Sequence, residues 1–237
     1  FYLLSREVAK HCKVVQSGQG ADELFAGYHW YPLVDGAEDP VAAYLAAFRD
    51  RTYEEYAVTV QQQWVQGDFS GDFVRQHFAQ PGADAAVDKA LRIDSTVMLV
   101  DDPVKRVDNM TMAWGLEART PFLDYRVAEL SARIPARFKL PEGGKYVLKE
   151  AARQVIPAEV IDRPKGYFPV PGLKHLQGAT LNWVREMLLD PSQERGLYNP
   201  QALEKLLADP DGQLTPLRGS KLWQLAAVNL WLSEQGL

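Results

Sequence analysis

Two glycines and two acidic residues lie together where a predicted strand meets a predicted helix. The segment 17–23, SGQGADE, follows Val14-Val15 and precedes apolar residues at helical spacing. Such a turn is a common anion site, because backbone N–H groups point outward and the helix dipole favours negative charge. Asp22 would repel a phosphate unless a cation lay between them, and Mg²⁺ is usually held by one or two carboxylates plus phosphates. The segment predicts a phosphate and Mg²⁺ site; the alternative is a tight turn in which Asp22 is only the helix N-cap.

Helical signals dominate the rest of the chain. Residues 13–16 read as a buried strand, and Asp102-Pro103 has the pattern of an N-cap followed by proline, which predicts a helix from there to about Trp114. Apolar spacing predicts further helices over 2–12, 40–50, 52–63, 84–99, 124–133, 144–154 and 216–232. A single strand is not a stable sheet, so we expect it to join strands from a preceding part of the protein. The start at Phe1, without Met and inside a predicted helix, likewise predicts a fragment of a longer protein.

Composition excludes several classes of protein. The 237 residues suffice for one large domain or two small ones, with 46% hydrophobic and 24% charged residues. A net charge of -5 argues against a nucleic-acid partner. Cys12 is the single cysteine, so no intrachain disulfide can form and a reducing compartment is favoured. No apolar run is long enough to span a membrane and no signal peptide is visible, so we expect a cytoplasmic protein without a membrane partner.

Three blocks resemble the asparagine synthetase family, in the family's order. Residues 17–28, SGQGADELFAGY, are close to the family's SGEGADELFGGY. Residues 101–113, DDPVKRVDNMTMA, run on into GLEARTPFLD at 115–124, and both are similar to consecutive family blocks. Residues 163–168, RPKGYF, resemble the family's R-x-K-x-G-F segment. The blocks lie within residues 13–168, and no motif is visible after about residue 175.

The resemblance implies an α/β parent fold of the ATP-pyrophosphatase (adenine nucleotide alpha hydrolase-like) type. Residues 1–237 would be the C-terminal portion of its ligase domain, mostly α-helical with one or two strands. The pyrophosphate loop S-G-G-x-D-S and the glutaminase domain would precede them. The implied activity is that of an ATP-dependent, glutamine-using amide ligase of amino-acid biosynthesis (EC 6.3.5 type). It would adenylate a carboxylate, transfer ammonia from the glutaminase domain, and release AMP and pyrophosphate. Members often form homodimers.

The resemblance also implies roles for individual residues. Ser17, Gly18 and Gly20 would line the ATP and acyl-adenylate site. Asp22 would bind Mg²⁺–pyrophosphate. Lys165 would contact the phosphates from a loop, although an isolated lysine of this kind is usually an ordinary surface residue.

Glu117 and Arg119 allow two interpretations. Glu117 could position or deprotonate the amine and Arg119 could meet the acceptor, or the two could form a buried ion pair that holds the loop before Pro121. Asp108 and Lys105 are interpreted as a helix-face salt bridge. The aromatic residues near Trp30 are expected to form core or pocket wall.

Gln19 departs from the family pattern, which has Glu there. Glutamine cannot accept a proton at neutral pH, but it can hydrogen-bond an acyl or carboxamide group. The acceptor could therefore be aspartate or another carboxylate. Residues 17–32 also resemble amidotransferases that act on N-acetylglutaminylglutamine, which is the alternative acceptor. A non-catalytic helical binding module is the alternative from another class. Since the pyrophosphate loop is absent, we expect the isolated chain to be inactive.

Overall fold

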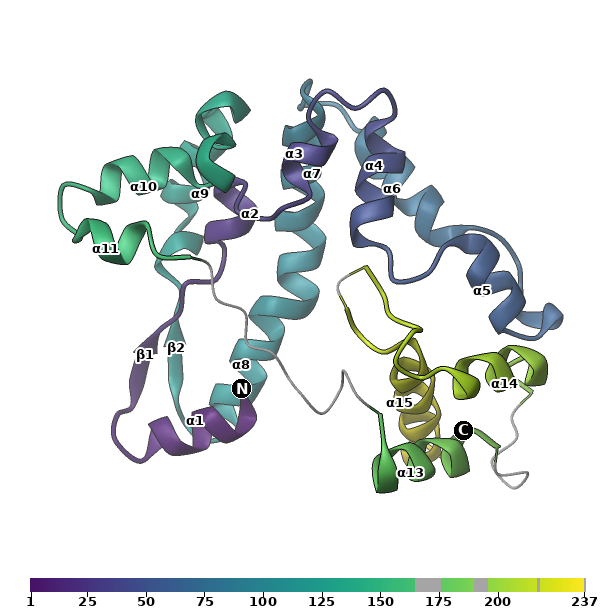
Figure 1. Ribbon diagram of the computed structural model, residues 1–237. Coiled ribbons are helices and arrows are strands. Elements are labelled where there is room, and N and C mark those ends of the chain that lie inside the picture. Colours follow the sequence, from purple (N-terminus) through teal and green to yellow (C-terminus); the bar gives the residue numbers. More distant parts are fainter. Residues whose placement is uncertain (165–175, 190–195, 217, 237) are drawn as a thin grey trace. The chain divides into compact units, whose positions relative to one another are not determined.

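The structure, a computed structural model, describes residues 1–164, 176–189, 196–216 and 218–236 (Figure 1). The chain divides into two compact units. The first contains residues 1–44 and 73–164, and the second contains residues 45–72 and 165–237. Lys165 therefore lies outside the described residues.

A two-stranded parallel sheet forms one part of the first unit. After helix α1 (Tyr2–Ala9), strand β1 (Val14–Gln16) pairs with strand β2 (Glu117–Arg119), with Val15 opposite Ala118 (Figure 1). The predicted strand at 13–16 is confirmed, but its predicted burial is wrong for this structure, in which Val14 is 53% exposed. We expected the neighbour of this strand to come from a preceding part of the protein, but its neighbour in the structure is β2, from later in the same chain. Glu-Ala-Arg has none of the β-branched or aromatic residues that mark strands, so only the pairing with β1 makes this segment extended.

Several helices connect the two strands. The first are α2 (Ala21–Phe25) and α3 (Tyr31–Val34), and the last are part of one continuous helical run that begins with α7 (Ala86–Ile93). Two π-helical segments, Asp94–Met98 and Val100–Val104, join α7 to α8 (Lys105–Met112) without a break. The predicted helix start at Asp102-Pro103 is therefore wrong, because Pro103 lies inside the helical run. Wider π turns change the hydrogen-bond ladder where proline has no N–H to donate.

Shorter helices complete the first unit. Helix α9 (Tyr125–Arg133) begins as predicted at Asp124, whose carboxylate accepts a bond from the Arg126 N–H at 2.9 Å. Helices α10 (Tyr146–Ala152) and α11 (Ala158–Ile161) follow. Helices α4 (Pro40–Phe48) and α6 (Phe69–Ala79) cross the boundaries between the units.

A buried carboxylate ties three elements of the first unit together. Asp94 is 0% exposed and accepts hydrogen bonds from Trp30 Nε1 at 3.0 Å and Tyr31 Oη at 2.6 Å, and a short one from Tyr44 Oη. Burial raises the pKa of Asp94, although the three donors oppose that shift. Trp30 and Tyr31 belong to the core, as expected for this aromatic cluster, whereas His29 is exposed.

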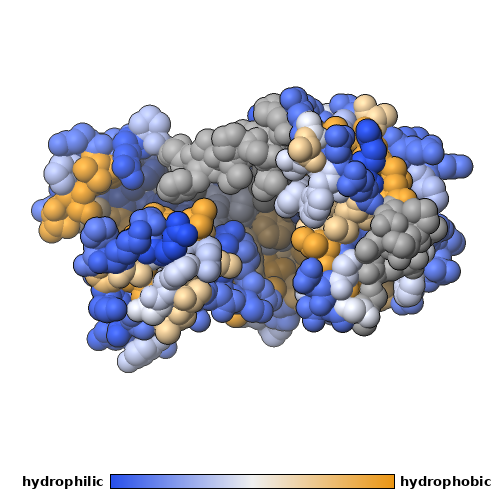
Figure 2. All heavy atoms as spheres, turned by 90° about the horizontal axis from the view of Figure 1, so that it is seen from below, coloured by the Kyte–Doolittle hydropathy of each residue, from blue (hydrophilic) through white to orange (hydrophobic). Residues whose placement is uncertain are grey.

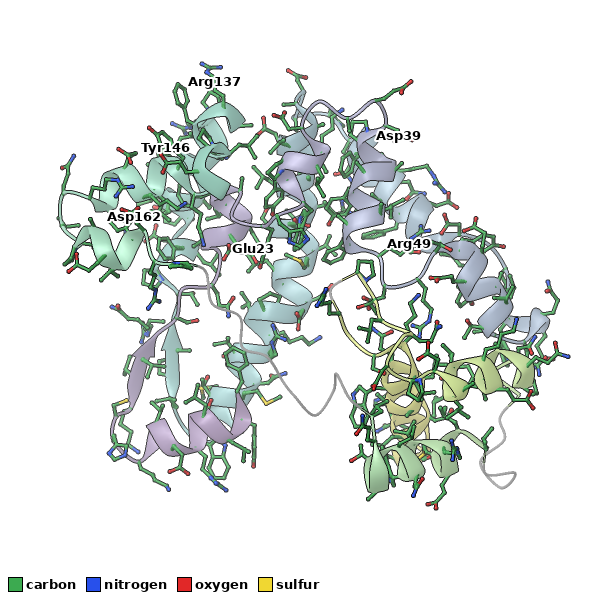
Figure 3. All side chains as sticks on the ribbon, in the orientation of Figure 1. Glu23, Asp39, Arg49, Arg137, Tyr146 and Asp162 are labelled. Carbon is green, nitrogen blue, oxygen red and sulfur yellow. The ribbon has the colours of Figure 1, made fainter. Side chains whose placement is uncertain are left out.

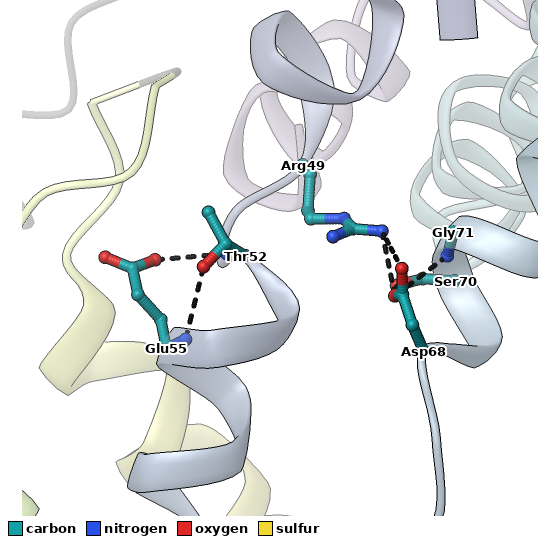
Figure 4. Close-up of polar contacts among 6 residues, drawn as sticks. All are labelled: Arg49, Thr52, Glu55, Asp68, Ser70 and Gly71. Carbon is teal, nitrogen blue, oxygen red and sulfur yellow. Dashed lines mark hydrogen bonds and ion pairs between the residues drawn. The ribbon is translucent and has the colours of Figure 1, made fainter. Parts of the chain in front are cut away.

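The second unit is a small helical assembly. Helices α13 (Gly178–Leu189), α14 (Pro200–Ala208) and α15 (Lys221–Glu234) share one core, which contains Val184, Leu188, Leu203, Leu206, Leu222 and Ala226. Helix α5 (Tyr53–Thr59) begins with a capping box, in which Thr52 and Glu55 each bond to the other's backbone N–H (Figure 4). Arg49 binds Asp68 at 2.9 Å, and Asp68 also accepts from the Gly71 N–H (Figure 4).

The surface alternates between polar and apolar side chains. On the face drawn in Figure 2, small hydrophobic areas are interspersed with hydrophilic ones. Several large apolar residues are exposed, among them Leu3, Tyr125, Leu130, Val155 and Val160. Within the described residues, the helices are all too short or too polar to cross a membrane.

Candidate active site

Asp22 and Lys145 form an ion pair at the start of α2. Asp22 Oδ1 lies 3.0 Å from Lys145 Nζ, and the two side chains are 24% and 26% exposed. The N-cap of α2 is Gly20, with φ 92°, so Asp22 belongs to the first turn and the alternative that it is an N-cap is wrong. Gly27 leaves room for this carboxylate, because a Cβ on Gly27 would lie 2.1 Å from Asp22 Oδ1.

The backbone before α10 directs Lys145 toward α2. Lys145 has φ 59°, in the left-handed region that costs a side-chain-bearing residue energy, and its N–H donates to the Phe25 carbonyl at 2.9 Å. Gly144 has φ 92°, and a Cβ there would lie only 2.0 Å from the Ala26 carbonyl oxygen. These two backbone contacts with the end of α2 therefore hold Lys145 in its unfavourable left-handed backbone conformation. In that conformation the Lys145 side chain reaches Asp22.

The loop 17–20 lies at the carboxyl edge of the parallel strands. The Ser17 N–H donates to the Arg119 carbonyl at 2.8 Å and so extends the ladder beyond β1. Gly18 is exposed, and a Cβ on it would meet open space, whereas a Cβ on Gly20 would lie 2.1 Å from Leu123 Cδ2. Gly20 is thus required for packing and for its positive φ, and Gly18 leaves the loop open to solvent. Gln19 lies between them and is half-buried.

Glu117 and Arg119 lie on one exposed face of β2. Arg119 Nε is 3.1 Å from Glu117 Oε1, and the side chains are 68% and 48% exposed. The interpretation of these residues as a buried ion pair is therefore wrong as to burial, since strand alternation directs both side chains to the same exposed face. Ala118 points to the other face.

A cavity of about 450 Å³ opens on that other face of β2. It is lined by Ala118 and Thr120 together with Asp101, Lys105 and Asp108 from the helical run, besides valines 100, 104 and 107. The ion pair on this helix joins Arg106 to Asp102 at 3.3 Å, rather than Lys105 to Asp108 as expected. Lys105 and Asp108 instead give the cavity charges of both signs.

Glu23 is buried directly beside Asp22 in the sequence. It is 1% exposed and accepts a 2.7 Å hydrogen bond from Tyr28 Oη (Figure 3 labels Glu23). Burial and the neighbouring Glu23 carboxylate raise the pKa of Tyr28. Of the Asp22-Glu23 pair, one carboxylate therefore faces a cation at the surface and the other is part of the interior.

Lys145 is not among the site residues predicted from the sequence. Its only local signal is Gly143-Gly144 in front of it, which marks a turn before a helix but does not say where the lysine points. Within the described residues there is no cluster of three or more His, Cys, Asp or Glu side chains that could hold a metal. Asp22 alone fits Mg²⁺ only together with phosphate oxygens, which is a usual arrangement for this ion.

Comparisons with known proteins place these observations in a family. The family model described as asparagine synthase matches residues 1–233. Asparagine synthetase [glutamine-hydrolyzing] 1 of Bacillus subtilis is 27% identical over 98% of this chain and 42% of its own length. Asparagine synthetase [glutamine-hydrolyzing] 1 of Saccharomyces cerevisiae is 29% identical over 86% of this chain and 30% of its own length. The human asparagine synthetase [glutamine-hydrolyzing] is 27% identical over 70% of this chain and 22% of its length. The chain thus spans less than half the length of these relatives, and it belongs to the asparagine synthase family.

Proposed function

We propose that this chain is the C-terminal part of an ATP-dependent, glutamine-using amide ligase of the asparagine synthase type. Family membership supports the proposal. The observation that carries it is the Asp22–Lys145 pair at 3.0 Å, held beside the carboxyl edge of the parallel strands, where α/β folds bind ligands.

The pair suits a bound metal–pyrophosphate group. Mg²⁺, when bound, would neutralise the phosphate charge that develops as pyrophosphate leaves. Asp22 would be the carboxylate that holds the metal. The Lys145 ammonium would then leave its ion pair with Asp22 and donate to a phosphate oxygen instead. In the absence of phosphate the two side chains satisfy each other, which keeps both in position. Lys165 would add a second cation from its own loop.

The proposed reaction has two steps. A carboxylate oxygen of the acceptor attacks the α-phosphorus of ATP, and the bond to the β-phosphate oxygen breaks, which gives the acyl-adenylate and pyrophosphate. Ammonia then attacks the acyl carbon, the bond to AMP breaks, and the amine loses a proton. Ser17, Gly18 and Gly20 would line the adenylate, and Gln19 would hydrogen-bond its acyl group.

Glu117 and Arg119 keep their proposed roles toward the amine and the acceptor. Their mutual ion pair would have to open first, which is inexpensive for an exposed pair. The cavity lined by Lys105, Asp108 and Thr120 lies on the opposite face of β2 from this pair, so the pair would meet the acceptor outside it.

Two variants, one at the N-cap of α10 and one within α10, test this proposal in the full-length protein. Lys145→Met should lower ATP–pyrophosphate exchange about 100-fold or more, the usual loss when one stabilising charge is removed. Lys149→Met is the matched control, because Lys149 lies on α10, just after Lys145, and its ammonium donates to the Glu142 carbonyl at 2.7 Å rather than to Asp22. Equal exchange in the two variants would contradict the role of Lys145. Absence of exchange in the unmodified full-length protein would favour the non-catalytic module.

The acceptor is tested separately. Aspartate and N-acetylglutaminylglutamine should be compared as substrates for amide formation by the full-length protein. Turnover of the acetylated dipeptide in preference to aspartate would support the interpretation of Gln19, and efficient turnover of aspartate alone would exclude it. The isolated 237-residue chain should form no amide from either acceptor, and detectable synthesis would contradict the need for the preceding pyrophosphate loop.

A further inference from the structure

A second cavity, of about 410 Å³, lies within the first unit, and neither Asp22 nor Lys145 lines it. Four charged residues contribute to its wall: Lys139, Asp88, Glu23 and Arg92. The Arg92 guanidinium already donates to the carbonyls of His77, Gln80 and Pro81, although its buried Nε has no hydrogen-bond partner in the described structure. Most of the remaining wall is apolar and includes Leu91, Leu99, Leu123 and Ala132. This volume is in the range of small-molecule sites, which combine apolar walls with a few polar groups.

Lys139 is unusual because its long charged side chain is only 2% exposed. Its backbone is engaged on both sides: the N–H donates to the Ala136 carbonyl at 2.8 Å, and the carbonyl accepts from the Tyr146 N–H at 3.1 Å. In the described part of the chain, the Lys139 ammonium forms no side-chain hydrogen bond or ion pair, and its Nζ is not fully buried. An ammonium with so little access to solvent is costly without an acceptor, so this one points to a partner that binds in the cavity.

Asp88 provides the opposite charge in the same cavity. It lies on α7, is half-buried, and forms no direct ion pair with Lys139. Burial lowers the pKa of Lys139, and the Asp88 charge opposes this; burial raises the pKa of Asp88, and the Lys139 charge opposes that. Both residues line the same cavity, so a single ligand there could contact both charges. Glu23 at the cavity wall already has its own donor in Tyr28.

We propose that this cavity binds a small aliphatic α-amino acid. Its carboxylate would accept from the Lys139 ammonium, its own ammonium would donate to the Asp88 carboxylate, and its side chain would contact the leucines. A zwitterion satisfies both charges at once, whereas a simple carboxylate would leave Asp88 without a partner. The site needs neither ATP nor the Asp22–Lys145 pair, so it can be tested independently of the proposed ligase activity.

The test is calorimetric titration of the full-length protein with L-leucine, without ATP. We expect saturable binding, at least ~10-fold weaker binding of 4-methylpentanoate and of 3-methylbutylamine, and a similar loss of L-leucine affinity in Lys139→Met and in Asp88→Asn. Lys89→Met is the matched control, because Lys89 follows Asp88 on α7 but does not line the cavity. The ligand-free Lys139→Met variant should also melt at a higher temperature, since it lacks an unpartnered buried charge.

Several results would overturn the proposal. Absence of saturable L-leucine binding would do so, as would equal affinity of the unmodified chain for 4-methylpentanoate, which would indicate recognition of the carboxylate alone. If sodium chloride raised the melting temperature as much as L-leucine does, Lys139 would bind anions in general, and the proposed amino-acid site would be excluded. If Lys139→Met does not fold, Asp88→Asn decides the matter, because unchanged L-leucine affinity in that variant excludes the zwitterion site.

Discussion

Substitution of Asp94 separates the need for an acceptor from the need for a charge in the first unit. Asp94 Oδ2 accepts from Trp30 Nε1 and Tyr31 Oη, and Oδ1 accepts from Tyr44 Oη. Asp94→Asn can keep its oxygen toward Trp30 and Tyr31 and turn its amide toward Tyr44, whose hydroxyl can accept instead of donate. Asp94→Ala leaves all three donors without this acceptor.

The expected magnitudes differ accordingly. Each buried group that loses its partner costs about 1–3 kcal/mol, and two of the three donors are hydroxyls that can rotate, so Asp94→Ala should cost about 3–5 kcal/mol. Asp94→Asn loses charge assistance in three bonds but avoids burial of a full charge at a site that is 0% exposed. Because burial raises the pKa of Asp94, desolvation outweighs the bonds, and the net cost should stay within about 1 kcal/mol.

Native-state hydrogen exchange of amides in α7 and α3 measures these costs within the first unit, and urea unfolding of the chain provides an independent comparison. A loss in Asp94→Asn as large as that in Asp94→Ala would refute the reasoning, because the carboxylate charge itself would then be essential. A loss below about 1 kcal/mol in Asp94→Ala would equally refute it, since the three donors would not depend on this acceptor.

Three further predictions concern other elements. Gly144→Ala should displace the turn before α10, because the new Cβ would lie 2.0 Å from the Ala26 carbonyl oxygen, and a lowered melting temperature with weaker ATP–pyrophosphate exchange in the full-length protein would confirm it. Thr52→Ala should cost the second unit about 1 kcal/mol by removal of the capping box, measured by urea unfolding; Thr52→Ser, which keeps the hydroxyl, is the control. Arg126 lowers the pKa of Asp124 to about 2 from 3.8, so this carboxylate stabilises the fold above pH 3.8 and the contribution disappears as the pH falls through about 2; Asp124→Asn should flatten the acid limb of stability against pH. An unchanged acid limb would contradict that assignment.

Much of the fold could be predicted from local sequence. The strand at 13–16, the cap at Asp124 and the helical periods of 40–50, 84–99 and 124–133 correspond to described elements. The family, whose domain has an adenine nucleotide alpha hydrolase-like fold, was visible in three short blocks. The errors arose where a local signal had a tertiary competitor. Asp102-Pro103 has the pattern of a helix start, yet the run from α7 continues through it in π turns.

The sequence by itself determined the chemistry that is present: a glycine turn, an acidic pair beside it, and cations farther along the chain. The tertiary structure decided which of these groups meet. Asp22 meets Lys145, 123 residues away, because the turn before α10 forms close backbone contacts with the end of α2. These contacts hold Lys145 in a left-handed backbone conformation. Glu117 and Arg119 meet each other on an exposed face because side chains alternate along β2, and Lys139 is 2% exposed in the folded chain. Spacing along a chain fixes contacts only within about one helical turn or one pair of strands. Contacts over longer distances depend on packing, and the sequence pattern does not state them.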